Sequence, residues 1–145
     1  MRLAAAVLPI ALAFSVPACA TDGEEPHQLL PIASEPNFHL YVSNQSFDLD
    51  LVDIQVYVDG DLAVAGDFPV GSQHSWFEFP LQLGPGEHAI RSATEAGDSE
   101  RVDTVDIADQ PRFGVVSFWF YDESSTEPTG PELSFNLFDD PPGFD

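Results

Sequence analysis

The sequence predicts an all-β protein whose folded part, residues 37–138, is an antiparallel β-sandwich of seven to eight strands. Short runs of β-branched and aromatic residues recur at regular spacing along the chain. Turn-forming Gly and Pro residues separate these runs, and no window of the sequence has the 3.6-residue periodicity of an amphipathic helix. A single domain of this length, with 43% hydrophobic residues, can bury a core without disulfides.

The densest apolar run is residues 113–121, Phe-Gly-Val-Val-Ser-Phe-Trp-Phe-Tyr. An extended strand of nine residues spans roughly 30 Å, and successive side chains point to opposite faces. Both faces of this run are apolar, which predicts a central strand that is covered on both sides. The alternative is that its aromatic side chains form an exposed platform for a ligand.

The other strands are expected on either side of this run. Asp59-Gly60 predicts a tight hairpin, because Gly tolerates a positive φ. We expect residues 68–71 to form a turn and Pro80 to end the strand before it. In chain order the expected strands are residues 38–43, 54–58, 62–65, 74–79, 87–93, 102–107, 113–121 and 133–137.

The N-terminus has the three parts of a secretory signal: the positive charge of Arg2, an apolar stretch over residues 3–16, and small residues at 17–20. This stretch is too short for a membrane-spanning helix. Ala18-Cys19-Ala20 fits ordinary signal peptidase. Val16-Pro17-Ala18-Cys19 instead resembles the lipobox of bacterial lipoproteins, and this resemblance implies that Cys19, the single Cys of the chain, is lipidated.

The lipoprotein resemblance implies a domain organisation and a location. Residues 1–18 would be the signal peptide, and residues 19–36 would be the lipidated Cys with an acidic, Pro-rich tether that we expect to be disordered. Residues 139–145 would form an acidic tail. Position 20 is Ala and not the Asp that retains such lipoproteins in the inner membrane. The resemblance therefore favours the outer membrane and leaves open whether the protein faces the periplasm or the cell surface.

The charge of the chain excludes several kinds of partner. Asp and Glu number 25 against four Lys or Arg, for a net charge of -21. A chain this poor in basic residues cannot assemble the patch that binds nucleic acid, and its field repels anionic lipid headgroups. The partners that remain are cations, basic proteins and neutral surfaces such as glycans, together with an envelope protein and the membrane through the lipid on Cys19.

The sequence contains no motif of an enzyme active site. Gly71-Ser72-Gln73 lacks the second Gly of a hydrolase nucleophile elbow, and a chain without Lys has no Schiff-base chemistry. The four histidines, residues 27, 39, 74 and 88, do not have the spacing of a zinc site. We therefore expect no enzymatic activity and no cofactor, apart from a candidate structural calcium ion.

Two groups of residues are candidate binding sites. Asp48, Asp50 and Asp53 lie in a polar stretch between strands, and several carboxylates on a flexible loop are what calcium prefers. The alternative is a solvated acidic loop. Trp76, Trp119 and Tyr121 are candidates for a face on which a ligand stacks, although a sandwich of this size also needs aromatic residues for its core.

A second resemblance concerns residues 54–91. Val56-Tyr57-Val58-Asp59-Gly60, followed by Gly86-Glu87-His88, resembles the pattern of PEGA domains and, more broadly, of immunoglobulin-like and carboxypeptidase-regulatory-like sandwiches. The resemblance implies an extracytoplasmic β module that binds or spaces and does not catalyse.

The sequence therefore predicts an exported, lipid-anchored, non-catalytic interaction or accessory protein of the cell envelope. The alternative function is that of a secreted or surface module that binds a glycan or calcium.

Overall fold

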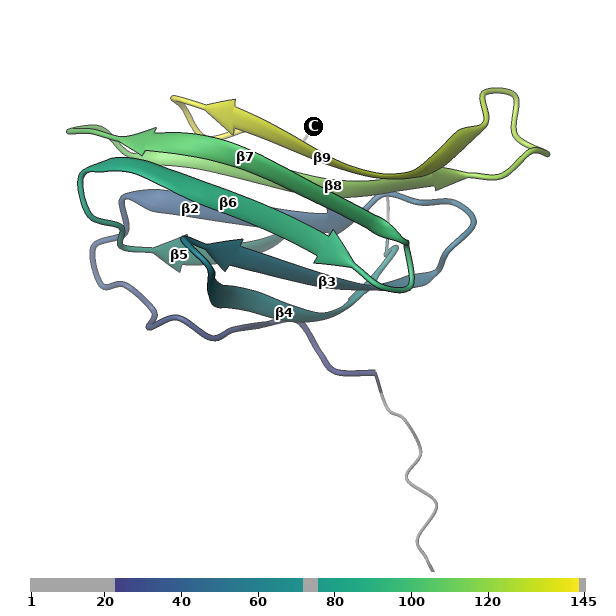
Figure 1. The fold of residues 1–145 in the computed structure, drawn as a ribbon, viewed down its shortest axis with the longest axis horizontal. Coiled ribbons are helices and arrows are strands. Elements are labelled where there is room, and N and C mark those ends of the chain that lie inside the picture. Colours follow the sequence, from purple (N-terminus) through teal and green to yellow (C-terminus); the bar gives the residue numbers. More distant parts are fainter. Residues whose placement is uncertain (1–22, 72–75, 144–145) are drawn as a thin grey trace, which may run out of the picture.

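The protein is an all-β sandwich in a computed structural model that describes residues 23–71 and 76–143 (Figure 1). No helix occurs among these residues. The nine strands are β1 His27–Gln28, β2 Phe38–Asn44, β3 Leu51–Val58, β4 Asp61–Pro69, β5 Phe77–Leu81, β6 Gly86–Thr94, β7 Ser99–Ile107, β8 Arg112–Tyr121 and β9 Thr129–Phe138.

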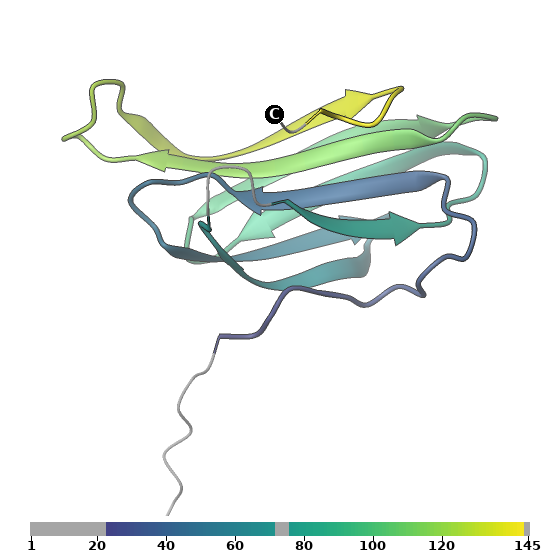
Figure 2. The same cartoon turned by 180° about the vertical axis from the view of Figure 1, so that it is seen from behind.

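The strands form two sheets that pack face to face (Figures 1 and 2). One sheet has five strands in the order β1-β4-β3-β6-β7, and the other has four in the order β5-β2-β8-β9. Neighbouring strands are antiparallel except for β2 and β8, which pair in parallel with Phe38 opposite Arg112. The predicted sandwich is confirmed, and the parallel pair is a feature that the strand pattern did not predict.

The core follows the two-residue period of the strands. On β3 the side chains of Val52, Ile54 and Val56 are fully buried, whereas the residues between them are partly exposed. Phe38 and Phe118 face them from the four-stranded sheet and are also fully buried. Each such side chain contributes about 1.5–3 kcal/mol of hydrophobic stabilisation, which explains how the fold forms without a disulfide.

Strand β8 lies between β2 and β9, which confirms the expected interior position of residues 113–121. Its inward side chains, including Val116 and Phe118, belong to the core. Its outward side chains are buried at Phe113 and Val115, and the ring of His39 on β2 stacks on Phe113 with 5.0 Å between centroids. Towards Tyr121 the outward face becomes partly exposed.

Two strand ends differ from the sequence expectation. Residues 68–71 do not form a turn, because β4 continues to Pro69 and buries Phe68 opposite Val52. Pro80 does not end a strand but lies inside β5, paired with His39. A proline is tolerated there because β5 is the edge strand of its sheet. One side of β5 has no neighbouring strand, so no backbone amide is needed on that side for a hydrogen bond. Residues 72–75 lie outside the described residues.

The expectation of a disordered tether was wrong from residue 23 onward. Residues 23–36 are here called the strap. Its residues 24–30 run along the outer edge of β4, and the rest leads on to β2 (Figure 1). Strand β1 lies within the strap and pairs with β4, and the backbone amide of Asp67 donates to the carbonyl of Glu24 at 2.6 Å. The acidic, Pro-rich composition indicated disorder. Composition alone cannot show that the edge of β4 has unpaired backbone groups to which this segment can hydrogen-bond.

Two residues hold the strap in place. The side-chain amide of Gln28 donates to the carbonyls of Leu30, Pro31 and Pro80 at 3.0–3.2 Å. Gly66 on β4 has a φ of 148°, and a Cβ at that position would lie 2.5 Å from the Cα of Pro26. Only a glycine therefore lets the strap approach β4 this closely.

Candidate functional site

The candidate ligand face lies on the outward side of the four-stranded sheet, where β8 ends. Strand alternation and the register of β8 place Trp119 and Tyr121 on this side, opposite Glu132 and Thr129 of β9. Both aromatic side chains are partly exposed. The indole nitrogen of Trp119 donates to Ser134 Oγ at 3.0 Å, which fixes the orientation of its ring.

A third aromatic ring completes a row with these two. The ring of Phe47 lies 5.2 Å from that of Tyr121, and the ring of Trp119 lies 6.4 Å from that of Tyr121. Phe47 is 56% exposed, which makes it one of the most exposed large apolar side chains of the described part of the chain. Sequence reasoning missed Phe47 because it stands alone in a polar stretch between two strands.

The loop that carries Phe47 is fixed to the end of β8 by its backbone. The amides of Gln45 and Phe47 donate to the carbonyls of Phe118 and Phe120 at 2.8 and 3.3 Å. The hydroxyl of Ser46 donates to the Phe120 carbonyl as well. Phe47 is therefore a fixed member of the row, since its backbone continues the pairing of β2 with β8.

Trp76 is placed apart from the other two predicted face residues. It comes directly before β5, and Phe77 pairs with Val42 of β2. Because β2 separates β5 from β8, Trp76 is two strand spacings, about 10 Å, from the strand of Trp119. The structure thus brings Trp119 and Tyr121 together and leaves Trp76 on another strand.

The β8–β9 loop projects at one end of the sandwich (Figures 1 and 2). A hollow of about 460 Å³ adjoins Tyr121 at this loop. Its other lining residues come from that loop and the start of β9: Ser125, Thr126, Glu127 and Thr129. The phenol ring of Tyr121, three aliphatic hydroxyls and one carboxylate therefore line the hollow. Its volume is in the range of small-ligand sites.

The three aspartates of the candidate calcium site accept hydrogen bonds in different parts of the fold. Asp53 accepts from the Thr94 hydroxyl at 3.0 Å and from two backbone amides of the β6–β7 turn at 2.8 and 3.0 Å. Asp48 accepts from the backbone amide of Asp122 after β8. The side chain of Asp50 is exposed. Within residues 23–71 and 76–143, no three His, Asp or Glu side chains are grouped to hold a metal ion.

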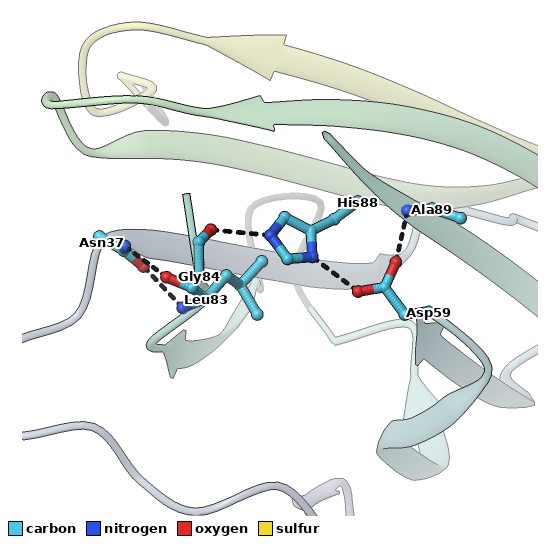
Figure 3. A network of polar contacts seen from close by, with 6 residues as sticks. All are labelled: Asn37, Asp59, Leu83, Gly84, His88 and Ala89. Carbon is cyan, nitrogen blue, oxygen red and sulfur yellow. Dashed lines mark hydrogen bonds and ion pairs between the residues drawn. The ribbon is translucent and has the colours of Figure 1, made fainter. Parts of the chain in front are cut away.

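Asp59, after β3, and His88, on β6, are in direct contact (Figure 3). His88 Nδ1 lies 2.6 Å from Asp59 Oδ2, and His88 Nε2 lies 2.8 Å from the Gly84 carbonyl. The second carboxylate oxygen of Asp59 accepts from the Ala89 amide at 2.9 Å. Both imidazole nitrogens thus face acceptors, which is the arrangement that the doubly protonated ring satisfies.

This contact shifts the ionisation of both partners. The hydrogen bond to Asp59, with a further one to the Gly84 carbonyl, raises the pKa of His88. The same hydrogen bond to His88, together with the Ala89 amide, lowers the pKa of Asp59. The pair ties the β3–β4 hairpin to β6, and the contact of His88 with Gly84 ties β6 to the turn before it. Since Asp59 has a φ of 52°, the contact also holds a backbone conformation that few residues adopt.

The other histidines have separate partners. His27 lies 3.5 Å from Glu24 within the strap, and His39 Nδ1 lies 2.7 Å from Glu78 on the outward face. His74 is outside the described residues. The structure therefore does not bring His27, His39 and His88 into one cluster.

Cys19, the predicted lipidation site, also lies outside the described residues. Over the part of the chain that the structure describes, no helix is long and apolar enough to cross a membrane. No family model matches the chain, and neither the curated proteins nor the solved structures contain a significant match to it.

Proposed function

We propose that this chain is an exported, lipid-anchored, non-catalytic interaction module of the cell envelope. The observation that carries the proposal is the row Phe47–Tyr121–Trp119, three partly or largely exposed rings beside a hollow on the projecting end of a rigid sandwich. Exposed aromatic rings with a few polar groups are typical of binding surfaces. The signal-like segment that ends at Cys19 supplies the export and the anchor.

The position of the strap supports a role close to the anchoring surface. Gly23, at the start of the described chain, lies against Leu51 and Asp67, near the start of β3. Phe47 belongs to the loop that leads into β3, so the aromatic row and the entry of the chain are at the same end of the sandwich. The four residues from Cys19 to Asp22 span at most about 14 Å. A lipid on Cys19 would therefore hold this end near the membrane surface.

The test is membrane partition of the native chain beside a Cys19→Ala variant, both expressed in a bacterial host. We expect the native chain in the membrane fraction after a high-salt wash, and the processed variant in the soluble fraction. The intact mass is measured in both cases. A mass without residues 1–18 but with acyl groups identifies the lipidated form, and a retained signal peptide identifies a precursor that is membrane-bound for another reason.

Native protein that is processed without acylation and recovered in the soluble fraction would contradict the anchor. The control is Ala20→Ser, which preserves both Cys19 and the small residue that follows it. This variant should partition like the native chain. If it does not, membrane partition depends on residue 20 as well as on Cys19.

A further inference from the structure

The hollow beside Tyr121 combines the groups that recognise one chemical class of ligand. Tyr121 supplies an aromatic face on one side, and Thr126 and Glu127, both exposed, supply polar groups on the other. The hydroxyl of Ser125 accepts from the Glu127 amide at 3.4 Å, so its own proton is available to a ligand. A ligand here would meet an apolar surface and hydrogen-bonding groups at once.

The part of the Tyr121 ring that lines the hollow favours a flat ligand. The plane of Tyr121 is inclined by only 30° to that of Phe47 and by 35° to that of Trp119. With ring centroids 5.2 and 6.4 Å apart, such small angles mean that neighbouring rings partly overlap, and they do not make the steep walls that enclose an ammonium group in an aromatic cage. A pyranose ring has flat faces of C–H bonds that pack on the part of Tyr121 that lines the hollow, and its hydroxyls reach the rim.

The charges around the site decide which saccharides fit. Among the described residues that line the hollow there is no Lys or Arg, and the one ionisable group besides the Tyr121 phenol is the carboxylate of Glu127. With a net charge of -21, the chain repels a polyanionic sugar. Glu127 instead can accept hydrogen bonds from sugar hydroxyls, and charged acceptors make the stronger hydrogen bonds.

We infer that the hollow beside Tyr121, with the row Phe47–Tyr121–Trp119, binds a neutral saccharide chain. This inference rests on the proposed function, because it names the ligand of the same interaction surface. Tyr121 is the central stacking residue, and Glu127 and the neighbouring hydroxyls bind the sugar hydroxyls.

The test uses the full chain, purified in a detergent without a sugar headgroup, and isothermal titration with cellohexaose, maltohexaose and chitohexaose. We expect saturable binding of at least one of them. The heat and affinity should be the same at low salt and at about 0.5 M salt, because a neutral ligand is not screened. Heparin should not bind. A pentalysine peptide is the cationic probe, and specific, salt-sensitive binding of this peptide in place of the sugars would overturn the inference.

Variants assign the binding to the hollow. Tyr121→Leu should weaken binding at least about tenfold, and Glu127→Gln should weaken it about threefold, since the amide oxygen of the new side chain remains an acceptor without the charge. The matched control is Tyr57→Leu, which removes a tyrosine from the outward side of the other sheet. Glu127 is exposed on a loop, so its variant stays informative if Tyr121→Leu lowers stability.

The inference is wrong if none of the three oligosaccharides binds, or if Tyr57→Leu weakens binding as much as Tyr121→Leu. If sugar binding fails and membrane partition is observed, the saccharide inference is rejected and the proposed envelope anchor stands. If partition fails and sugar binding is observed, the anchor is rejected and the saccharide inference stands. The two proposals can therefore fail separately.

Discussion

His88 lies between two hydrogen-bond acceptors, Asp59 Oδ2 at Nδ1 and the Gly84 carbonyl at Nε2. The folded state therefore favours the protonated imidazole, which can donate to both, over the neutral ring. Its pKa is raised, so the contact stabilises the fold fully below the ordinary value of 6.5 and loses that contribution as the pH rises through the higher folded-state value. The pKa of Asp59 is lowered. Its contribution is therefore present above 3.8 and lost only as the pH falls through the lower folded-state value.

We therefore predict that His88→Asn destabilises the protein by about 1 kcal/mol near pH 5.5 and by clearly less near pH 8.5. The estimate is modest because the Asp59 side chain is 50% exposed and solvent screens the pair. Thermal unfolding at the two pH values, followed by circular dichroism, measures the difference. An equal loss at both values would contradict a charged His88.

Asp59→Asn is the matched variant for this experiment. Asn tolerates a positive φ and retains an acceptor for the Ala89 amide, so this change removes the charge and leaves the turn in place. In an Asp59→Asn background, His88→Asn should show little remaining pH dependence.

Asp53 gives a prediction that separates a hydrogen-bonding role from a calcium role. Because it accepts three hydrogen bonds around the β6–β7 turn, Asp53→Ala should cost about 2 kcal/mol in free energy of unfolding. We expect this loss to be the same in EDTA and in millimolar calcium. Asp50→Ala, an exposed change in the same stretch, should stay within about 0.5 kcal/mol.

A calcium site at these aspartates would produce the opposite pattern. Calcium would raise the melting temperature of the native chain, because a ligand that binds only the folded state stabilises it. The loss caused by Asp53→Ala would then be larger in calcium than in EDTA.

At the scale of the element, the strap depends on Gly66 and Gln28. Gly66→Ala places a Cβ against Pro26, and Gln28→Ala removes three hydrogen bonds without changing β4. We predict that each change speeds amide hydrogen exchange of residues 24–30 by at least about tenfold. Exchange read by mass spectrometry on peptides of the strap checks this.

Gly60→Ala is the control for the strap variants. Gly60 also has a positive φ, 91°, but a Cβ there meets nothing within 4 Å. This variant carries the backbone strain of an alanine and does not touch the strap, so exchange of residues 24–30 should not change. If the strap amides of the native chain exchange as fast as those of an unfolded peptide, β1 does not form in solution.

The strands were predictable from the sequence because each shows its buried face in a two-residue period, as β3 does with Val52, Ile54 and Val56. The parallel pairing of β2 with β8 was not predictable, since a run of apolar residues does not reveal which strand becomes its neighbour. Strand β1 was missed for a related reason. His27 and Gln28 have no strand pattern of their own, and it is the edge of β4 that orders them.

The candidate site was predictable in part. Alternation along residues 113–121 correctly placed Trp119 and Tyr121 on one face. Phe47 and the residues of the hollow were not predictable, because they lie in loops whose positions depend on tertiary contacts with the end of β8. A lone phenylalanine in a polar loop was the one signal available in the sequence.

At the scale of the whole molecule, self-repulsion is the dominant electrostatic property. Without residues 1–18 the chain has three Arg against 25 acidic residues, a net charge of -22. Compacting so many like charges costs free energy, and salt screens that cost. We predict that raising sodium chloride from about 0.01 M to about 0.3 M at neutral pH raises the melting temperature by about 5 °C.

The salt prediction is checked by thermal unfolding with sodium chloride and with choline chloride. Equal rises in the two salts indicate screening, and a rise in sodium alone would indicate a specific cation site. A melting temperature that falls with salt would show that the ion pairs of Arg91 with Glu100 and of Arg101 with Asp103 outweigh the repulsion.

The strap also has a mechanical consequence in a chain anchored at Cys19. Tension between the membrane and a bound partner reaches β1 before it reaches the core, because β1 is a two-residue strand at the edge of its sheet. Peeling residues 23–36 from the sandwich would free a segment with a contour length of roughly 45–50 Å while both sheets keep their cores. The strap would therefore lengthen under tension before either sheet loses its core.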